Sequence, residues 1–254
     1  EFALGSKVVK SAPYAAEAVT ETVQTLGDGN RIVHKSTVQM ARDGQGRTRR
    51  DLSPLRIGPL AQGNTPKITV IHDPVNDVSY TLDHNAKVAR KMKGQGMIVH
   101  MSSDEKGEAG APKDVRNFRM ELHSAADVVT AAPVGPVMIR VPKNGTTQKK
   151  ESLGKQSIEG VVAEGTRTTD TIPAGAVGNE RPIEIVNEQW YSPELQTIIM
   201  TRHKDPRMGE TTYKLTTIRR GEPLPSLFEV PGDYSVTDAP SPRIHMMRRP
   251  APKE

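Results

Sequence analysis

The sequence contains no cysteine and few aromatic residues, and both absences limit what the chain can be. Without cysteine it has no disulfide, no thiolate metal site and no cysteine nucleophile. A cysteine-free chain tolerates either redox state, so this absence assigns no compartment. Aromatic residues make up 4% of the 254 residues, with one Trp and three Phe. The core must therefore be built mainly from Val, Ile, Leu and Met.

Long apolar runs are also missing. No run reaches the roughly 18 residues that a membrane-spanning helix needs, so we expect no transmembrane segment. The chain does not start with a basic and apolar signal sequence, and we expect any such signal to have been removed. Residues 1–6 (EFALGS) contain the dipeptides that common restriction sites encode, which predicts a cloning remnant.

Strand-like runs and strong turns alternate most clearly in residues 181–236. The sequence SPEL at 192–195 favours a type I turn, because proline presets the backbone angle of its second position. Residues 205–210 (DPRMGE) combine an Asp, a Pro and a Gly that can take positive φ. The runs around these turns are rich in Ile, Val, Thr and aromatic residues. They predict three antiparallel strands, at Ile183 to Tyr191, Leu195 to His203 and Thr211 to Arg219, closed by an apolar segment.

Residues 13–92 show the same pattern of short strands and turns. Residues 13–26 fit helical spacing and also strand composition, and we predict a strand because the hairpin signal GDGN follows them. The charge of residues 47–52 suits an edge strand or a solvent-facing strand. A further strand is expected at 161–171, with Gly165 as a bulge or a point of close crossing. The remaining expected strands are 31–42, 67–72, 78–82 and 88–92.

Two regions break this pattern. Residues from about 93 to 150 are polar and glycine-rich with little periodicity, which predicts a flexible or irregular insertion. Residues 237–254 are rich in proline and basic residues, which predicts a flexible tail. We therefore predict a single, mainly β domain over residues 7–236. Its expected form is one large curved antiparallel sheet, a half-barrel built from successive hairpins with few helices.

Basic residues outnumber acidic ones between residues 31 and 56, although the net charge of the chain is only +5. The simplest interpretation is a solvated strand face. The functional interpretation is a patch for phosphate or lipid head groups, formed by Arg42, Arg47, Arg49 and Arg50. We expect no nucleic acid partner, because neither a recognised binding motif nor a row of stacking aromatic residues accompanies the charge.

Sequence patterns of catalysis are missing. None of the seven His pairs with another at metal-ligand spacing, so we expect no metal and no cofactor. Glu184 and Glu188 share a strand face, where carboxylates are far more often exposed than paired for acid–base work. There is no Gly-x-Ser-x-Gly elbow and no glycine-rich phosphate loop. We therefore expect a protein that is not an enzyme, with a hydrolase of unrecognised site as the enzymatic alternative.

Several segments carry a resemblance to known proteins: Leu153 to Gly160, Glu188 to Leu195, Leu227 to Pro231 with Asp233 and Tyr234, Asp28 to Ile32, Asp43 to Arg47, and Ile172 to Gly175. They look like exported bacterial proteins of unknown function that are common in acidobacteria. The succession of hairpins closed by Phe228-Glu-Val-Pro231 is more distantly similar to the lipoprotein-carrier fold of LolA and RseB. The resemblance implies a periplasmic or cell-envelope protein with a curved sheet that shelters acyl chains.

Two functional classes follow. In the first, the concave face binds a lipid, a lipoprotein acyl chain or another hydrophobic ligand. In the second, the protein is an envelope interaction or sensing module that binds a protein partner and no small ligand. For each expected ligand-lining residue the alternative is ordinary core packing. These residues are Trp190, Tyr191, Ile198, Met200, Leu215 and Phe228.

Overall fold

The computed structural model describes residues 8–52, 67–93 and 146–238 of the chain. Within these ranges the chain forms twelve strands and one short 3₁₀ helix, η2, and all the strands belong to one sheet. The predicted mainly β fold class is therefore confirmed. The expected cloning remnant and most of the expected insertion and tail lie outside the described residues.

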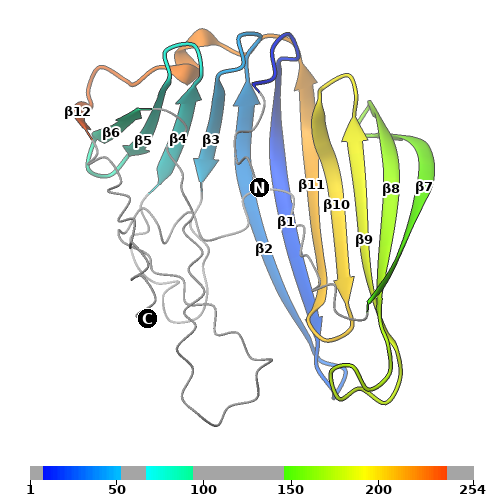
Figure 1. Cartoon of the computed structure of the whole chain (residues 1–254). Coiled ribbons are helices and arrows are strands. Elements are labelled where there is room, and N and C mark those ends of the chain that lie inside the picture. The colour runs from blue at the N-terminus through cyan, green and yellow to red at the C-terminus, as the bar shows by residue number, and fades with distance from the viewer. Residues whose placement is uncertain (1–7, 53–66, 94–145, 239–254) are drawn as a thin grey trace, which may run out of the picture.

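The strands follow one another as hairpins in two groups, each of which occupies one half of the sheet (Figure 1). The first group is β1 (Tyr14–Thr25), β2 (Arg31–Arg42), β3 (Thr48–Leu52), β4 (Ile68–Asp73), β5 (Val78–Asp83) and β6 (Val88–Lys93). The second group is β7 (Thr147–Ile158), β8 (Val161–Ile172), β9 (Ile183–Ser192), β10 (Thr197–Asp205) and β11 (Gly209–Arg220). A short final strand, β12 (Ser235–Asp238), follows η2 (Pro225–Phe228).

Strand β1 joins the two groups. It pairs antiparallel with β2, its hairpin partner, and on its other side with β11. The order across the sheet is β12-β6-β5-β4-β3-β2-β1-β11-β10-β9-β8-β7, so β12 and β7 are the two edges. Every neighbouring pair is antiparallel except β12 with β6, which run parallel.

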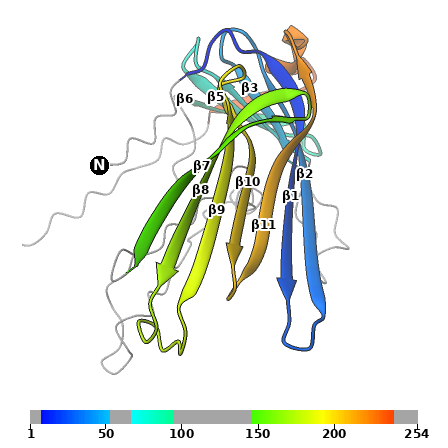
Figure 2. The same cartoon turned by 90° about the vertical axis from the view of Figure 1, so that its right-hand side faces the viewer.

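The sheet is strongly curved and remains open. Figure 2 looks along it from the β7 side and shows the long strands turning away toward the shorter β3, β5 and β6 at the back. The two edge strands do not pair with each other. The expected half-barrel is thus the observed architecture, and its two faces can be called concave and convex.

Strand pairing assigns the side chains to these faces, because directly opposed residues lie on the same side of a sheet. Leu215 is opposite Ala18, and Ala18 is opposite Val38. These residues lie on the concave face. Trp190 is opposite Met200, which is opposite Lys214, and this set lies on the convex face.

The closing segment, residues 221–234, packs on the convex face of the first group of strands. Helix η2 contacts β3 and β4, and Phe228 is buried there. The hydroxyl of Tyr234 lies 2.7 Å from Nδ1 of His84, and the backbone N–H of Ser235 donates to the carbonyl of Lys87. The buried residues of this cluster are Ala41, Ile71, Leu82, Ala89, Phe228 and Tyr234.

The tip of the β7–β8 hairpin bends over the convex face of the second group (Figure 2). Nζ of Lys214 on β11 lies 2.7 Å from Oε1 of Glu159 at this tip. Beneath it, the indole ring of Trp190 lies against Gly165, which has no side chain to occupy that space. The predicted close crossing at Gly165 is therefore confirmed.

Two expectations about single strands are corrected. The charged segment 47–52 is not an edge strand, because β3 lies between β2 and β4. Its charge is accommodated by internal pairing, as between Arg49 and Asp51 at 2.8 Å. The true edge strand β7 begins at Thr147, inside the segment predicted to be irregular. Most side chains of β7 are polar and exposed, as is typical of an edge strand. Its sequence therefore shows no clear alternation of apolar and polar residues.

Candidate ligand-binding face

The upper part of the concave face, toward the first residues of β1, is apolar. A row of directly opposed residues crosses five strands, and all of them are buried. A second row lies beside it and includes Ala16, Met40, the charged Arg50 and Val70. Ala16 and Ala18 belong to β1, the second of these five strands, so the shortest side chains of both rows lie on that strand. The first row, here called the apolar row, is Leu215, Ala18, Val38, Leu52 and Ile68.

Tyr213 lies at the lower border of this apolar region. It is buried, and burial raises the pKa of its phenol, so the ring stays neutral. Its hydroxyl donates to Sδ of Met40 over 3.7 Å. The polar end of the ring is thus satisfied within the face.

Further along the same strands, the concave face becomes polar without becoming charged. Two successive rows of opposed residues cross six strands, from β8 to β2. We call them the neutral polar rows. The first consists of Thr166, Gln189, Thr201, Tyr213, Thr20 and Ser36. The second consists of Thr168, Asn187, His203, Thr211, Thr22 and His34.

His203 lies within the second neutral polar row with 4% of its surface exposed. Its Nδ1 lies 2.6 Å from Oδ1 of Asn187, and its buried Nε2 has no hydrogen-bond partner. Burial lowers the pKa of the imidazole, which keeps the ring neutral at neutral pH. With Nδ1 donating to the amide oxygen of Asn187, Nε2 carries a free lone pair that can accept a hydrogen bond.

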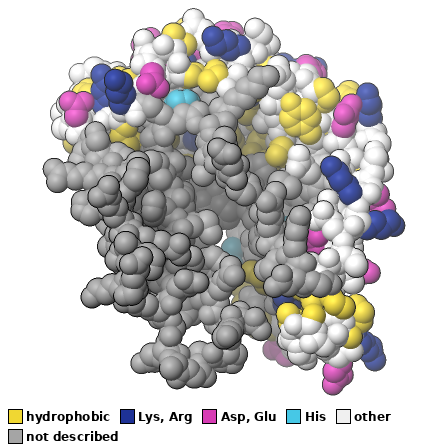
Figure 3. Space-filling model, viewed as in Figure 1, with side chains coloured by type: hydrophobic (Ala, Val, Ile, Leu, Met, Phe, Trp, Pro, Cys, Tyr) yellow, Lys and Arg dark blue, Asp and Glu magenta, His cyan; other side chains and the backbone are white. Residues whose placement is uncertain are grey.

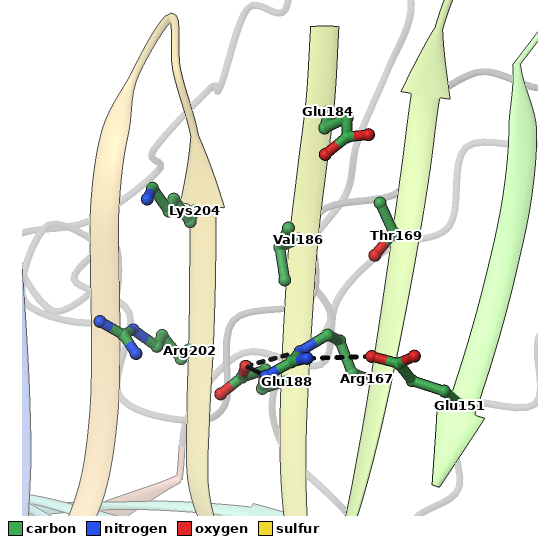
Figure 4. A pocket seen from close by; sticks show the side chains of 8 residues that line it. All are labelled: Glu151, Arg167, Thr169, Glu184, Val186, Glu188, Arg202 and Lys204. Atoms are coloured by element: carbon green, nitrogen blue, oxygen red, sulfur yellow. Dashed lines mark hydrogen bonds and ion pairs between the residues drawn. The ribbon is translucent and has the colours of Figure 1, made fainter. Parts of the chain in front are cut away.

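The convex face of the same strands is charged. A row of opposed residues there alternates in sign almost without interruption: Lys35, Glu21, Thr212, Arg202, Glu188, Arg167 and Glu151. Arg167 contacts Glu188 at 2.6 Å and Glu151 at 2.9 Å, and these carboxylates raise its pKa. Part of this row lines a shallow depression of about 360 Å³ (Figure 4).

This depression does not have the features of a catalytic site. Glu188, considered above with Glu184 as a carboxylate pair, is engaged by Arg167, and Arg202 is engaged by Glu210 at 2.7 Å. Ion pairs of this kind on an open strand face are typical of a solvated surface. In residues 8–52, 67–93 and 146–238, no group of three or more His, Asp or Glu could hold a metal ion.

The structure separates the six residues expected to line a ligand site. Trp190 and Met200 are on the convex face, beneath the hairpin tip. Leu215 is on the concave face. Tyr191, the residue after Trp190 on β9, is also on the concave face, opposite Ile198. Phe228 is in the separate cluster under η2. The six residues therefore do not share one surface.

The residues of β1 that line the concave face were missed because they are small or polar. Ala16, Ala18 and Thr20 carry no signal of their own in a sequence. The available signal was the alternation along β1, where every second residue from Tyr14 to Thr20 is buried. Residues 13–26 also fitted helical spacing, and that ambiguity hid the alternation.

The four arginines of the expected anionic patch lie apart and are mostly engaged. Arg42 is buried and donates from Nε and Nη2 to the carbonyl of Ala12, and from Nη2 to the carbonyl of Leu195. Arg47 pairs with Asp43, and Arg49 with Asp51. Arg50 points to the concave face, opposite Met40 and Val70. Figure 3 shows charged side chains scattered over the visible described surface.

Comparisons with known proteins identify only distant structural likenesses. No protein-family profile matches the chain, and no curated protein does. An uncharacterised conserved protein from Thermus thermophilus matches with 8% identity and a TM-score of 0.40, over 90% of this chain and 91% of that one. The Pseudomonas aeruginosa MucA/MucB complex matches with 9% identity and a TM-score of 0.38, over 89% of this chain and 58% of that one.

A LolA superfamily protein from Nitrosomonas europaea matches with 8% identity and a TM-score of 0.27, over 87% of this chain and 92% of that one. A LolA superfamily protein is thus among the solved structures that this chain resembles, at a low level of similarity. Because these TM-scores are below 0.5, the likenesses assign no function to the chain. The acidobacterial origin, the export and the envelope location stay predictions.

Among the described residues, no helix has the length and apolar character needed to cross a membrane.

Proposed function

We propose that the protein is not an enzyme and binds the acyl chain of a lipid or lipoprotein on the concave face of its sheet. The apolar row that runs unbroken from Leu215 to Ile68 carries this proposal. Of the described elements that pack over the sheet, η2 and the β7–β8 tip lie on the convex side, whereas the turn between β9 and β10 reaches Arg42 on the concave side through the carbonyl of Leu195.

The size of the hydrophobic effect makes such binding feasible. Burial of one methylene contributes about 0.8 kcal/mol. About ten buried methylenes would therefore contribute about 8 kcal/mol, the free energy of micromolar binding, before the cost of association is subtracted. The apolar row offers aliphatic side chains for this contact, and the short side chain of Ala18 leaves room between Leu215 and Val38.

The test measures uptake of a fluorescent fatty acyl probe by the purified protein. Ala18→Phe places a large ring in the apolar row, between Leu215 and Val38, and should weaken binding at least tenfold. Val19→Phe is the matched control, because Val19 lies on the convex face of the same strand, opposite Lys214. Ala18→Val provides a smaller change if the Phe variant does not fold.

Native mass spectrometry of protein purified from bacteria should show a bound lipid. Protein that is uniformly free of lipid and takes up no acyl probe would instead support the alternative of a protein-binding envelope module. Unchanged probe binding by folded Ala18→Phe would remove the concave face from consideration as the binding surface.

A further inference from the structure

The two neutral polar rows differ sharply from the other face of the same strands. Along β10, the charged Arg202 lies on the convex face between Thr201 and His203 on the concave face. Along β1, Glu21 lies in the same way between Thr20 and Thr22.

Strands β8 and β9 repeat this arrangement. Arg167 is flanked by two threonines, and Glu188 is flanked by Asn187 and Gln189. Within these two rows, charge is therefore confined to the convex side of the strands, and the first charged residues on the concave side, Asp170 and Asp205, lie one row further along β8 and β10. The concave side keeps hydrogen-bonding groups and excludes charge over two rows and six strands.

This composition fits one kind of bound group. Threonine hydroxyls and the amides of Asn187 and Gln189 both donate and accept hydrogen bonds, so they match hydroxyl and amide groups. An ionised head group buried against them would have no opposite charge, and an uncompensated buried charge costs several kcal/mol. The rows therefore favour a polar group that carries no charge.

The free lone pair of His203 points to the same conclusion independently. Nε2 is buried and has no hydrogen-bond partner, although buried polar atoms are normally paired. An unpaired acceptor inside a row of neutral hydrogen-bonding side chains calls for a donor from a bound molecule. A hydroxyl or an amide N–H supplies one.

We propose that the neutral polar rows bind the uncharged head group of an amphiphile, with a head-group hydroxyl or amide N–H donating to Nε2 of His203. This inference rests on the proposed function, because the acyl chain of the same molecule lies on the adjacent apolar row. The ligand class is therefore a neutral acylated alcohol or amide, such as a monoacylglycerol. Arg50 lies on the concave face one row beyond the apolar row and acts electrostatically on Tyr213 of the first neutral polar row, so its contribution is tested separately with Arg50→Gln.

The test compares three lipids that share one oleoyl chain and differ only in the head group. Monooleoylglycerol, oleate and the phosphate-bearing lyso-oleoylphosphatidylglycerol compete with the fluorescent acyl probe. We expect monooleoylglycerol to bind at least tenfold more tightly than either anionic lipid. His203→Leu should weaken monooleoylglycerol binding about tenfold and change oleate binding less than twofold. Arg202→Gln, on the other face of the same strand, is the control and should change neither.

Each outcome separates this inference from the proposed function. If the three lipids bind equally, or if His203→Leu weakens all three alike, the head-group site is refuted while acyl-chain binding stands. A preference for the anionic lipids that is lost in Arg50→Gln would place the head group on the other side of the apolar row, next to Arg50. If none of the lipids displaces the probe and none binds, the proposed function itself fails. Thr22→Val tests the same row if His203→Leu does not fold.

Discussion

Gly165 lies directly opposite Trp190, and a Cβ atom at Gly165 would come within 2.7 Å of two carbons of the indole ring. The same atom would lie 2.8 Å from Cβ of Leu153. The lack of a side chain at Gly165 is thus what allows the only tryptophan of the chain to pack beneath the β7–β8 tip.

Gly165→Ala should therefore destabilise the protein by about 1 to 3 kcal/mol through overpacking. Urea unfolding followed by Trp190 fluorescence measures this change at the site of the clash. Gly232→Ala is the control, because a Cβ there meets nothing within 4 Å, and its effect should stay within about 0.5 kcal/mol. An unchanged midpoint for Gly165→Ala would mean that the hairpin tip shifts freely.

Phe228→Ala should lower the free energy of unfolding by about 3 to 5 kcal/mol, because the ring is buried in the cluster under η2. Chemical denaturation measures the loss. Leu224→Ala, four residues earlier and 71% exposed, should change stability by less than about 0.5 kcal/mol. A loss below about 0.5 kcal/mol for Phe228→Ala would show that the closing segment is only a surface strap.

Arg42→Met should destabilise the protein by about 3 kcal/mol, since it leaves the buried carbonyls of Ala12 and Leu195 without their donor. It also removes the guanidinium that lies 4.9 Å from the centre of the Tyr14 ring. Arg31→Met at an exposed position is the matched control. Equal stability of the two variants would contradict a structural role for Arg42.

The pH dependence of stability should show a contribution from His203. Burial lowers its pKa in the folded state below the ordinary 6.5, so the unfolded chain takes up a proton first as the pH falls. Stability should therefore be unaffected by this group above pH 6.5 and decrease below it. His203→Gln should flatten the slope between pH 6.5 and 5, by at most about 1.4 kcal/mol per pH unit.

His72 contributes a slope of the same sign, because burial also lowers its pKa. His203→Gln should therefore flatten the curve of stability against pH only in part. Asp205 acts in a different range. Its pKa is lowered by Arg207, so its contribution is lost only as the pH falls below about 3.8. If stability changes with pH between 6.5 and 5 by the same amount in His203→Gln and in the unaltered protein, the contribution assigned to His203 is refuted.

The fold could be predicted largely from the turns. Proline, glycine and asparagine signals separated strands whose alternation was readable, as at Arg31–Arg42, which the structure reproduces to the residue. The partners of these strands were readable only within hairpins. The pairing of β1 with β11 and of β12 with β6 joins distant segments, and no local pattern encodes such contacts.

The candidate binding face could be predicted less well, because aromatic and large apolar residues drew the prediction toward Trp190, Met200 and Phe228. A register shift between Ile198 and Met200 changes which residues of β10 share a face, and this shift has no sequence signature here. The buried histidine was equally hidden. His203 differs from the exposed His34 only in its place in the sheet.

The position of β1 also sets the order in which the molecule can fold. Its hairpin partner β2 follows after a short turn, but its other neighbour, β11, comes roughly 200 residues later, where Tyr14 meets Arg220. During synthesis the edge of β1 that pairs with β11 therefore stays unpaired until nearly the whole sheet has left the ribosome. Loop closure over such a distance makes slow folding the expected behaviour of this chain. An unpaired β1 edge is also the place where a chaperone would act and where aggregation would start.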